Sequence, residues 1–115
     1  MKEQQKGVLV RIFITEDEKY NHKPLFEEIV KKAHELKLAG ATVLRGIMGY
    51  GSDSRIHSAK FVRLNEDLPV VIEIVDCQEN IDKILPFLDE AVTSGLITIE
   101  NIAVLKYGNQ SRQNQ

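Results

Sequence analysis

Two segments of this chain are apolar on both faces of a β-strand, and they constrain its fold more than any other feature. The first runs from Val8 to Ile14 and the second from Leu68 to Val75, and both are rich in β-branched residues. Side chains alternate between the two faces of a strand, so both faces of these strands must be covered. A chain of 115 residues has room for one hydrophobic core. We therefore expect its own helices to cover one sheet face and another subunit to cover the other.

Two amphipathic helices accompany these strands. Pro24 suits a first helical position, and apolar residues recur after it at spacings of three and four as far as Leu36. Gly40 is the expected C-terminal cap of this helix. The second helix has the apolar stripe Ile81, Ile84, Leu85 and Leu88. Pro86 within it removes a backbone donor and is expected to kink it.

The order of elements completes the fold prediction. A second strand is expected at Ala41–Met48 and a last strand within Ile97–Tyr107. With right-handed crossovers, the order predicts an α+β, ferredoxin-like βαββαβ fold, in which one four-stranded antiparallel sheet carries two helices on one face. We expect this domain to span residues 8–107, with disordered polar segments at 1–7 and 108–115.

Composition narrows the classes of function. The formal charge of −2 gives no general reason to expect nucleic acid or a membrane surface as a partner. The single cysteine, Cys77, cannot form an intramolecular disulfide and is expected to be a buried, inert thiol. The polar first residues are not followed by a long apolar run, which argues against a secretory signal. A cytoplasmic protein is expected, and His22 and His34 lack the spacing of metal ligands.

The most unusual segment runs from Arg45 to Gly51 and contains three glycines. Glycines at a strand end let a ligand approach the backbone, while Tyr50 offers a ring for stacking on a base. Arg45 and Arg55 suit phosphate oxygens, which His57 could also contact. The alternatives are a strand end with a flexible loop and, for His57, a solvated loop histidine.

Charged residues elsewhere favour structural roles. Arg11 and Glu73 each interrupt an apolar strand face, and we expect a structural ion pair between the neighbouring first and third strands. Glu66 and Asp67 are most simply solvated turn residues. No serine–histidine–acid or cysteine–histidine arrangement is evident in the sequence, so we expect a protein that is not an enzyme.

Three stretches resemble a small prokaryotic family, the PII-like domain of unknown function 190. They are RGIMGYG (45–51), DLPVVIEIVD (67–76) and KPLFEEIVKKAHELKLAGATV (23–43). The resemblance covers about a hundred residues. It implies a ferredoxin-like homotrimer that binds an adenine nucleotide in clefts between subunits and contacts a target protein through the loop after the second strand.

On this resemblance, Arg45, Gly46, Gly49, Tyr50 and Gly51 would line or shape the cleft, and Lys106 would lie where phosphates are approached. Residues 52–65 would form the target-contacting loop, and a membrane transporter or channel is one class of target that the family suggests. PII proteins carry a glycine-rich phosphate loop before the last strand, whereas residues 92–97 here contain one glycine and no basic residue. AMP or ADP is therefore expected rather than a triphosphate, and no cofactor is required.

Three alternatives remain on the same fold. A trimeric cation-tolerance-type protein without a nucleotide would need metal ligands, which Cys77 and three scattered histidines supply poorly. An acylphosphatase would need an arginine-bearing glycine loop after the first strand, and residues 15–23 contain neither residue type. RNA binding would need aromatic residues on the central strands, where only Phe13 qualifies.

Overall fold

Four strands and two helices form the body of the molecule. The computed structural model describes residues 4–52, 54–59 and 67–108. The main sheet has the strand order β4-β7-β1-β8, and each neighbouring pair is antiparallel. Its elements are β1 (Gln5–Thr15), α1 (Leu25–Glu35), β4 (Ala41–Arg45), β7 (Pro69–Asp76), α2 (Gln78–Ala91) and β8 (Leu96–Val104). This arrangement confirms the predicted ferredoxin-like fold.

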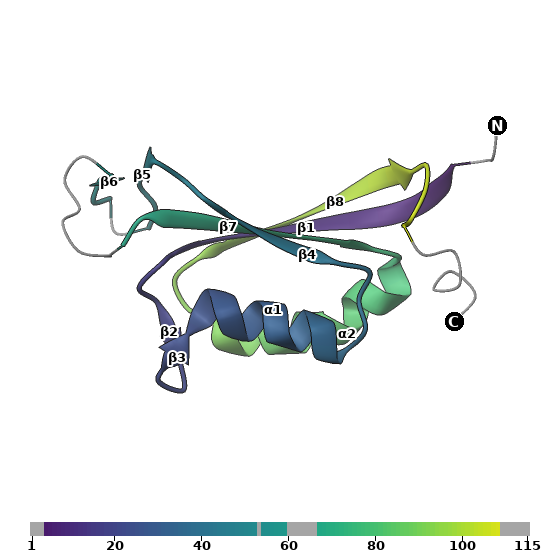
Figure 1. Cartoon of the computed structure of the whole chain (residues 1–115), viewed down its shortest axis with the longest axis horizontal. Helices are drawn as coiled ribbons and strands as arrows, with labels where there is room; N and C mark the ends of the chain where they lie inside the picture. The colour runs from purple at the N-terminus through teal and green to yellow at the C-terminus, as the bar shows by residue number, and fades with distance from the viewer. Residues whose placement is uncertain (1–3, 53, 60–66, 109–115) are drawn as a thin grey trace.

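Both helices lie on the same side of the sheet (Figure 1). The two apolar stripes face the strands, so that Ile29 of α1 and Ile84 of α2 are fully buried against Ile12 and Ile72 of the sheet. Burial of these side chains is the main favourable term in folding. Pro86 is accommodated within α2, which runs unbroken from Gln78 to Ala91.

The opposite face of the sheet is apolar and is not covered by a described helix. Phe13 and Leu44 on this face are 36% and 50% exposed. At its centre, Arg11 Nε lies 2.9 Å from Glu73 Oε2, and Arg11 Nη1 lies 3.2 Å from Glu100 Oε1. The predicted pair between the first and third strands is therefore confirmed. Its hydrogen bond to Glu73 raises the pKa of Arg11 above the ordinary value, so the guanidinium stays charged.

The first helix ends earlier than the sequence predicted. Gly40 is not its cap: the helix stops at Glu35, and Lys37 adopts the left-handed conformation with φ 62°. The Leu38 N–H donates to the Ala33 carbonyl at 3.0 Å and the Lys37 N–H to the His34 carbonyl at 3.0 Å. These two bonds form a Schellman motif, in which buried Leu38 packs near Ala33. The hydrophobic contact fixes the turn here although a lysine occupies the position that glycine favours.

Two small hairpins were not predicted. β2 (Lys19–Tyr20) pairs with β3 (Lys23–Pro24), and β5 (Met48–Gly49) pairs with β6 (His57–Ser58). The first turn has positive φ at both Asn21 and His22, as a type I′ turn requires. Because Asn-His lacks the glycine of the usual signal, the sequence did not reveal it.

Some predicted boundaries shift. The second strand ends at Arg45 rather than Met48. β1 begins at Gln5, because Gln5, Lys6 and Gly7 pair with β8, so these residues are part of the sheet and not of a disordered segment. The expectations for residues 1–3 and 109–115 lie outside the described residues. None of the described helices is long and apolar enough to cross a bilayer.

Gly95 supplies a test of the packing between β1 and the segment before β8. A Cβ atom at this position would lie 2.6 Å from the Phe13 carbonyl oxygen and 2.8 Å from Ile14 Cγ2. We expect Gly95→Ala to lower the free energy of unfolding by about 1–3 kcal/mol, because backbone must shift to admit the methyl group.

The matched control is Gly40→Ala, since nothing lies within 4 Å of a Cβ atom there. This variant should change stability by less than about 0.5 kcal/mol, or stabilise slightly through the unfolded chain. Urea unfolding at one protein concentration measures both. Equal midpoints for the two variants would contradict the packing described here.

Candidate functional site

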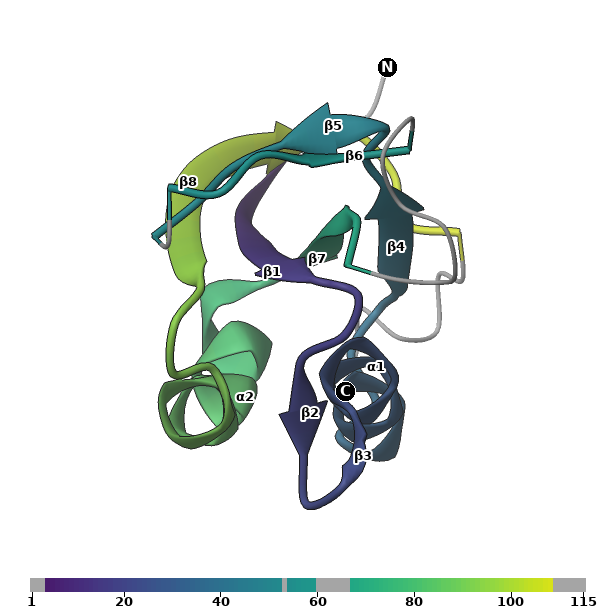
Figure 2. The same ribbon diagram turned by 90° about the vertical axis from the view of Figure 1, so that its left-hand side faces the viewer.

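A pocket of about 520 Å³ lies where the β5–β6 hairpin meets the ends of β1 and β7. Figure 1 shows the hairpin at one end of the sheet, away from the start of β1. Viewed from that end, β5 and β6 extend across the sheet between β4 and β8 (Figure 2). The pocket is lined by Phe13, Ile14, Thr15, Asp17, Glu18, Gly46, Met48, Gly49, Tyr50, Gly51, Ser52, His57, Pro69, Val70, Val71 and Ser94.

Two of the predicted glycines let the hairpin approach Pro69. A Cβ atom at Gly46 would lie 3.0 Å from Pro69 Cγ, and one at Gly49 would lie 3.2 Å from the same atom. The Gly46 N–H donates to the Pro69 carbonyl at 2.7 Å. Neither glycine has a positive φ, so close approach rather than a special turn explains both. Gly51 also lines the pocket, and a Cβ there would meet nothing within 4 Å.

His57 anchors the hairpin from the inside of the pocket. Its side chain is 6% exposed, and Nδ1 lies 3.1 Å from Asp67 Oδ2. Arg55 Nη2 lies 3.6 Å from the same carboxylate oxygen. The interpretations of His57 as a solvated loop histidine and of Asp67 as a solvated turn residue are therefore wrong. His57 and Asp67 are ten residues apart in the sequence, and no local sequence pattern predicts their contact.

The two basic residues of the predicted site, Arg45 and Lys106, do not line this pocket. Arg45 does not line the pocket, because its guanidinium is paired with Glu16 after β1. Lys106 follows β8, and the last residue of β8 pairs with Gln5 at the far end of the sheet. Lys106 and Glu73 line a separate cavity of about 420 Å³. Within one chain, the structure brings together Gly46, Gly49, Tyr50, Gly51 and His57 and leaves these two bases outside.

The segment after β1 contributes residues that sequence reasoning missed. Glu18 Oε2 accepts hydrogen bonds from the Thr15 N–H at 2.8 Å and the Thr15 hydroxyl at 3.1 Å, and Asp17 Oδ1 lies 2.7 Å from that hydroxyl. A glutamate that accepts from the backbone N–H of a threonine three residues earlier makes one of the two hydrogen bonds of a capping box. The Thr-x-x-Glu pattern at residues 15–18 was the sequence signal that could have indicated this contact, although no helix follows it directly.

Hydrogen bonds join this segment to the other walls of the pocket. The Ser94 hydroxyl donates to Glu18 Oε1 at 3.3 Å, and the Ser52 hydroxyl donates to the Ser94 carbonyl at 2.9 Å. Three loops that are remote in sequence are thereby held around one space. Tyr50 is 73% exposed at its edge, where its ring is open to stacking by a planar ligand.

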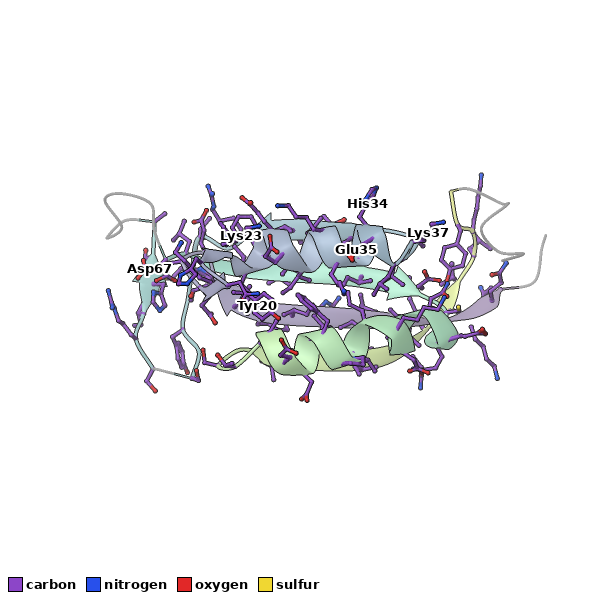
Figure 3. All side chains as sticks on the ribbon, turned by 90° about the horizontal axis from the view of Figure 1, so that it is seen from below. Tyr20, Lys23, His34, Glu35, Lys37 and Asp67 are labelled. Atoms are coloured by element: carbon purple, nitrogen blue, oxygen red, sulfur yellow. The ribbon has the colours of Figure 1, made fainter. Side chains whose placement is uncertain are left out.

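A second cavity, of about 260 Å³, lies at the other end of the molecule. Figure 3 shows Lys37, which lines this cavity, at the end opposite Asp67. Buried Asp76 accepts hydrogen bonds there from the Ala39 N–H at 2.8 Å and from Asn80 at 3.1 Å. Burial, together with the charge of Asp76, raises the pKa of the Tyr107 hydroxyl above 10. These contacts close the end of the core.

Cys77 lies next to Asp76 in the sequence and is half-buried. It is therefore more accessible than the buried thiol that the sequence predicted.

Comparisons with known proteins agree on family and fold. The model of the DUF190 family, described as an uncharacterized ACR, matches residues 7–104. A UPF0166 protein of Aquifex aeolicus is 42% identical over 102 residues, covering 87% of this chain and 94% of the relative. A UPF0166 protein of Methanocaldococcus jannaschii is 36% identical, covering 88% of this chain and 94% of the relative.

Among solved structures, this chain is similar to CPII, a nitrogen regulatory PII-like protein from Thiomonas intermedia K12, bound to ADP, AMP and bicarbonate. The TM-score is 0.67 at 18% identity, and the alignment covers 90% of this chain and 92% of CPII. At this identity the likeness establishes the fold.

The His57–Asp67 contact gives a testable prediction for the hairpin. We expect Asp67→Ala to destabilise the protein by about 1–3 kcal/mol, because the buried ring of His57 loses its carboxylate. The hairpin should open more often, so exchange of the Ala59 N–H, which donates to the Ile47 carbonyl at 3.0 Å, should quicken.

Native-state hydrogen exchange measures this local opening. Asp82→Ala is the control, because Asp82 is exposed on α2 and does not line the pocket. Unchanged exchange at Ala59 in Asp67→Ala would show that the contact does not hold the hairpin.

Proposed function

This chain belongs to the DUF190 family, and we propose that it is a PII-like regulatory protein, not an enzyme, that binds an adenine nucleotide. The proposed ligand is AMP or ADP, and the proposed site is the pocket under the β5–β6 hairpin. One observation carries the proposal: five of the eight candidate residues named from the sequence line a single pocket.

The chemistry of the pocket suits a nucleoside. Its volume of about 520 Å³ falls within the range of small-molecule sites, roughly 300–1,000 Å³. Phe13, Pro69 and Val71 give it an apolar wall, and Tyr50 offers a ring on which an adenine base can stack. CPII, which has the same fold, was crystallised with ADP and AMP, and this supports the choice of ligand.

We propose a homotrimer as the working form, and the bare sheet face supports assembly with other subunits. Apolar side chains surround the central Arg11–Glu73 pair on this face, including Leu44, Phe13 and Leu96, which are 36–57% exposed. A patch of this kind is usually covered by another protein surface. In such an assembly, Lys106 of a neighbouring subunit would approach the phosphates of the ligand, and Arg45 at the rim would assist it.

The same hairpin would communicate with a partner protein. Ile47 and Ile56 flank the pocket on the hairpin and are 81% and 57% exposed. Because the hairpin also forms a wall of the pocket, ligand binding would change the shape that a partner meets. The predicted target-contacting loop, 52–65, includes 53 and 60–65, which lie outside the described residues. A membrane transporter or channel is the class of target we favour, approached from the cytoplasm.

The cation-tolerance alternative gains no support from the site. No group of three His, Cys, Asp or Glu side chains that could hold a metal ion occurs among residues 4–52, 54–59 and 67–108. We therefore retain nucleotide binding as the proposal.

Nucleotide binding predicts a measurable stabilisation. A ligand at one hundred times its dissociation constant adds about 2.7 kcal/mol per site, which a thermal-shift assay resolves. We expect AMP and ADP to raise the melting temperature. Tyr50→Ala should weaken their binding by about 1–3 kcal/mol, the usual contribution of one stacked base.

Ile47→Ala is the matched control, since Ile47 is exposed on the same hairpin but does not line the pocket. Calorimetric titration of both variants separates loss of stacking from a general effect on the hairpin. If no adenine nucleotide at millimolar concentration shifts the melting temperature, the proposed function is wrong.

Assembly through the bare face makes a separate prediction. Leu44→Asp should dissociate the oligomer, because burying an unpaired carboxylate in an apolar interface is costly. Lys19→Asp on the β2–β3 hairpin, away from this face, should leave it intact. Sedimentation velocity distinguishes the species, and a monomeric wild-type protein at micromolar concentration would rule out the assembly.

A further inference from the structure

The described residues that line the pocket include two acidic side chains and no lysine or arginine. Asp17 and Glu18 both line it, and His57 is the one other titratable side chain besides Tyr50 among the described lining residues. A site built to hold a chain of phosphates normally presents arginine, lysine or a run of backbone N–H groups. This pocket presents carboxylates instead.

The charges around the rim do not reverse this balance. Each rim arginine is paired with a carboxylate, Arg45 with Glu16 and Arg55 with Asp67. The acids at or around the pocket are Glu16, Asp17, Glu18 and Asp67, and the bases are Arg45 and Arg55. Four negative and two positive charges leave a formal net charge of −2 on these described residues with His57 counted as neutral, and Lys106 of a neighbouring subunit would bring it to −1.

The two carboxylates retain capacity to accept hydrogen bonds. An ionised carboxylate has about four acceptor positions. The Thr15 hydroxyl has a single proton, which it can donate to Asp17 or to Glu18 but not to both, so acceptor positions remain on both carboxylates. Glu18 is held by Thr15 and Ser94, so its orientation is fixed before a ligand arrives. A positioned carboxylate accepts hydrogen bonds from sugar hydroxyls, as the acidic residue of dinucleotide-binding folds does with ribose.

We infer that the pocket holds the nucleoside end of its ligand and discriminates against each added phosphate. Asp17 and Glu18 accept hydrogen bonds from the ribose hydroxyls and repel negative charge, so the phosphates point out of the pocket. This inference rests on the proposed function, and it makes the two acids the residues that determine specificity. The order of affinity is adenosine at least equal to AMP, then ADP, then ATP.

Calorimetric titration with adenosine, AMP, ADP and ATP tests this order. The first series contains EDTA and no divalent cation, at about 0.1 M salt. We expect affinity to fall about threefold to tenfold for each phosphate beyond the first, as unit charges a few ångströms apart in partly aqueous surroundings imply. At about 1 M salt, where the screening length falls from about 10 Å to about 3 Å, the differences should shrink.

Two variants assign the effect to a residue. Asp17→Asn removes one charge and keeps an acceptor for the Thr15 hydroxyl, and it should raise the ratio of ATP affinity to adenosine affinity about threefold to tenfold. Glu79→Gln makes the same change of charge on α2, where Glu79 lines the cavity at the other end of the molecule. That control should leave the ratio unchanged.

The outcomes separate this inference from the proposed function. If ATP binds as tightly as adenosine without a divalent cation, or if Asp17→Asn behaves like Glu79→Gln, the inference is overturned while nucleotide binding stands. If added Mg²⁺ makes ATP the tightest ligand and Asp17→Asn abolishes that gain, the acids serve as metal ligands and the inference is also overturned. If none of the four compounds binds, the proposed function itself fails, and the inference with it.

Discussion

The whole structure depends on the alternation of side chains along β1 and β7. Both strands are apolar at successive positions, so the sheet is apolar on both faces, and two short helices can cover only one of them. On the covered face, Ile12 and Ile72 pair across the sheet and are fully buried. On the other, Phe13 and Val71 pair in the same way but remain partly exposed. The same register therefore builds the core and leaves a surface suited to another subunit.

The Arg11–Glu73–Glu100 cluster has a role that follows from this surface. Charges at the centre of an apolar face cost free energy when they are buried, unless they are paired. Here Arg11 is paired within one chain across three strands, since it contacts a glutamate on each side. One arginine and two glutamates leave the cluster with a formal charge of −1, and a face with fixed charges favours one orientation of the partner over others.

Part of the candidate site could be predicted from the sequence alone. The glycines between Arg45 and Gly51 pointed to the loop that forms one wall of the pocket, because three glycines within seven residues need a physical reason. The reason proved to be close packing on Pro69, which no pattern in the loop indicates. Asp17, Glu18 and Ser94 were missed, since each belongs to a different connection and joins the pocket through hydrogen bonds to another. Lys106 was assigned by family resemblance, and a single chain does not bring it to the pocket.

The sequence by itself determined the order of elements, the two apolar stripes of the helices and the burial of alternate strand residues, because each is a local property with its own period. It also determined the Arg11–Glu73 pairing, once strand order fixed which residues are neighbours. Tertiary structure alone decided that His57 is buried against Asp67, that the β5–β6 hairpin forms over Pro69, and that the pocket has acidic walls. Those features arise from contacts between segments that are far apart in sequence. Such contacts stabilise the protein only once the intervening chain has been closed into loops, and no local sequence pattern reports them.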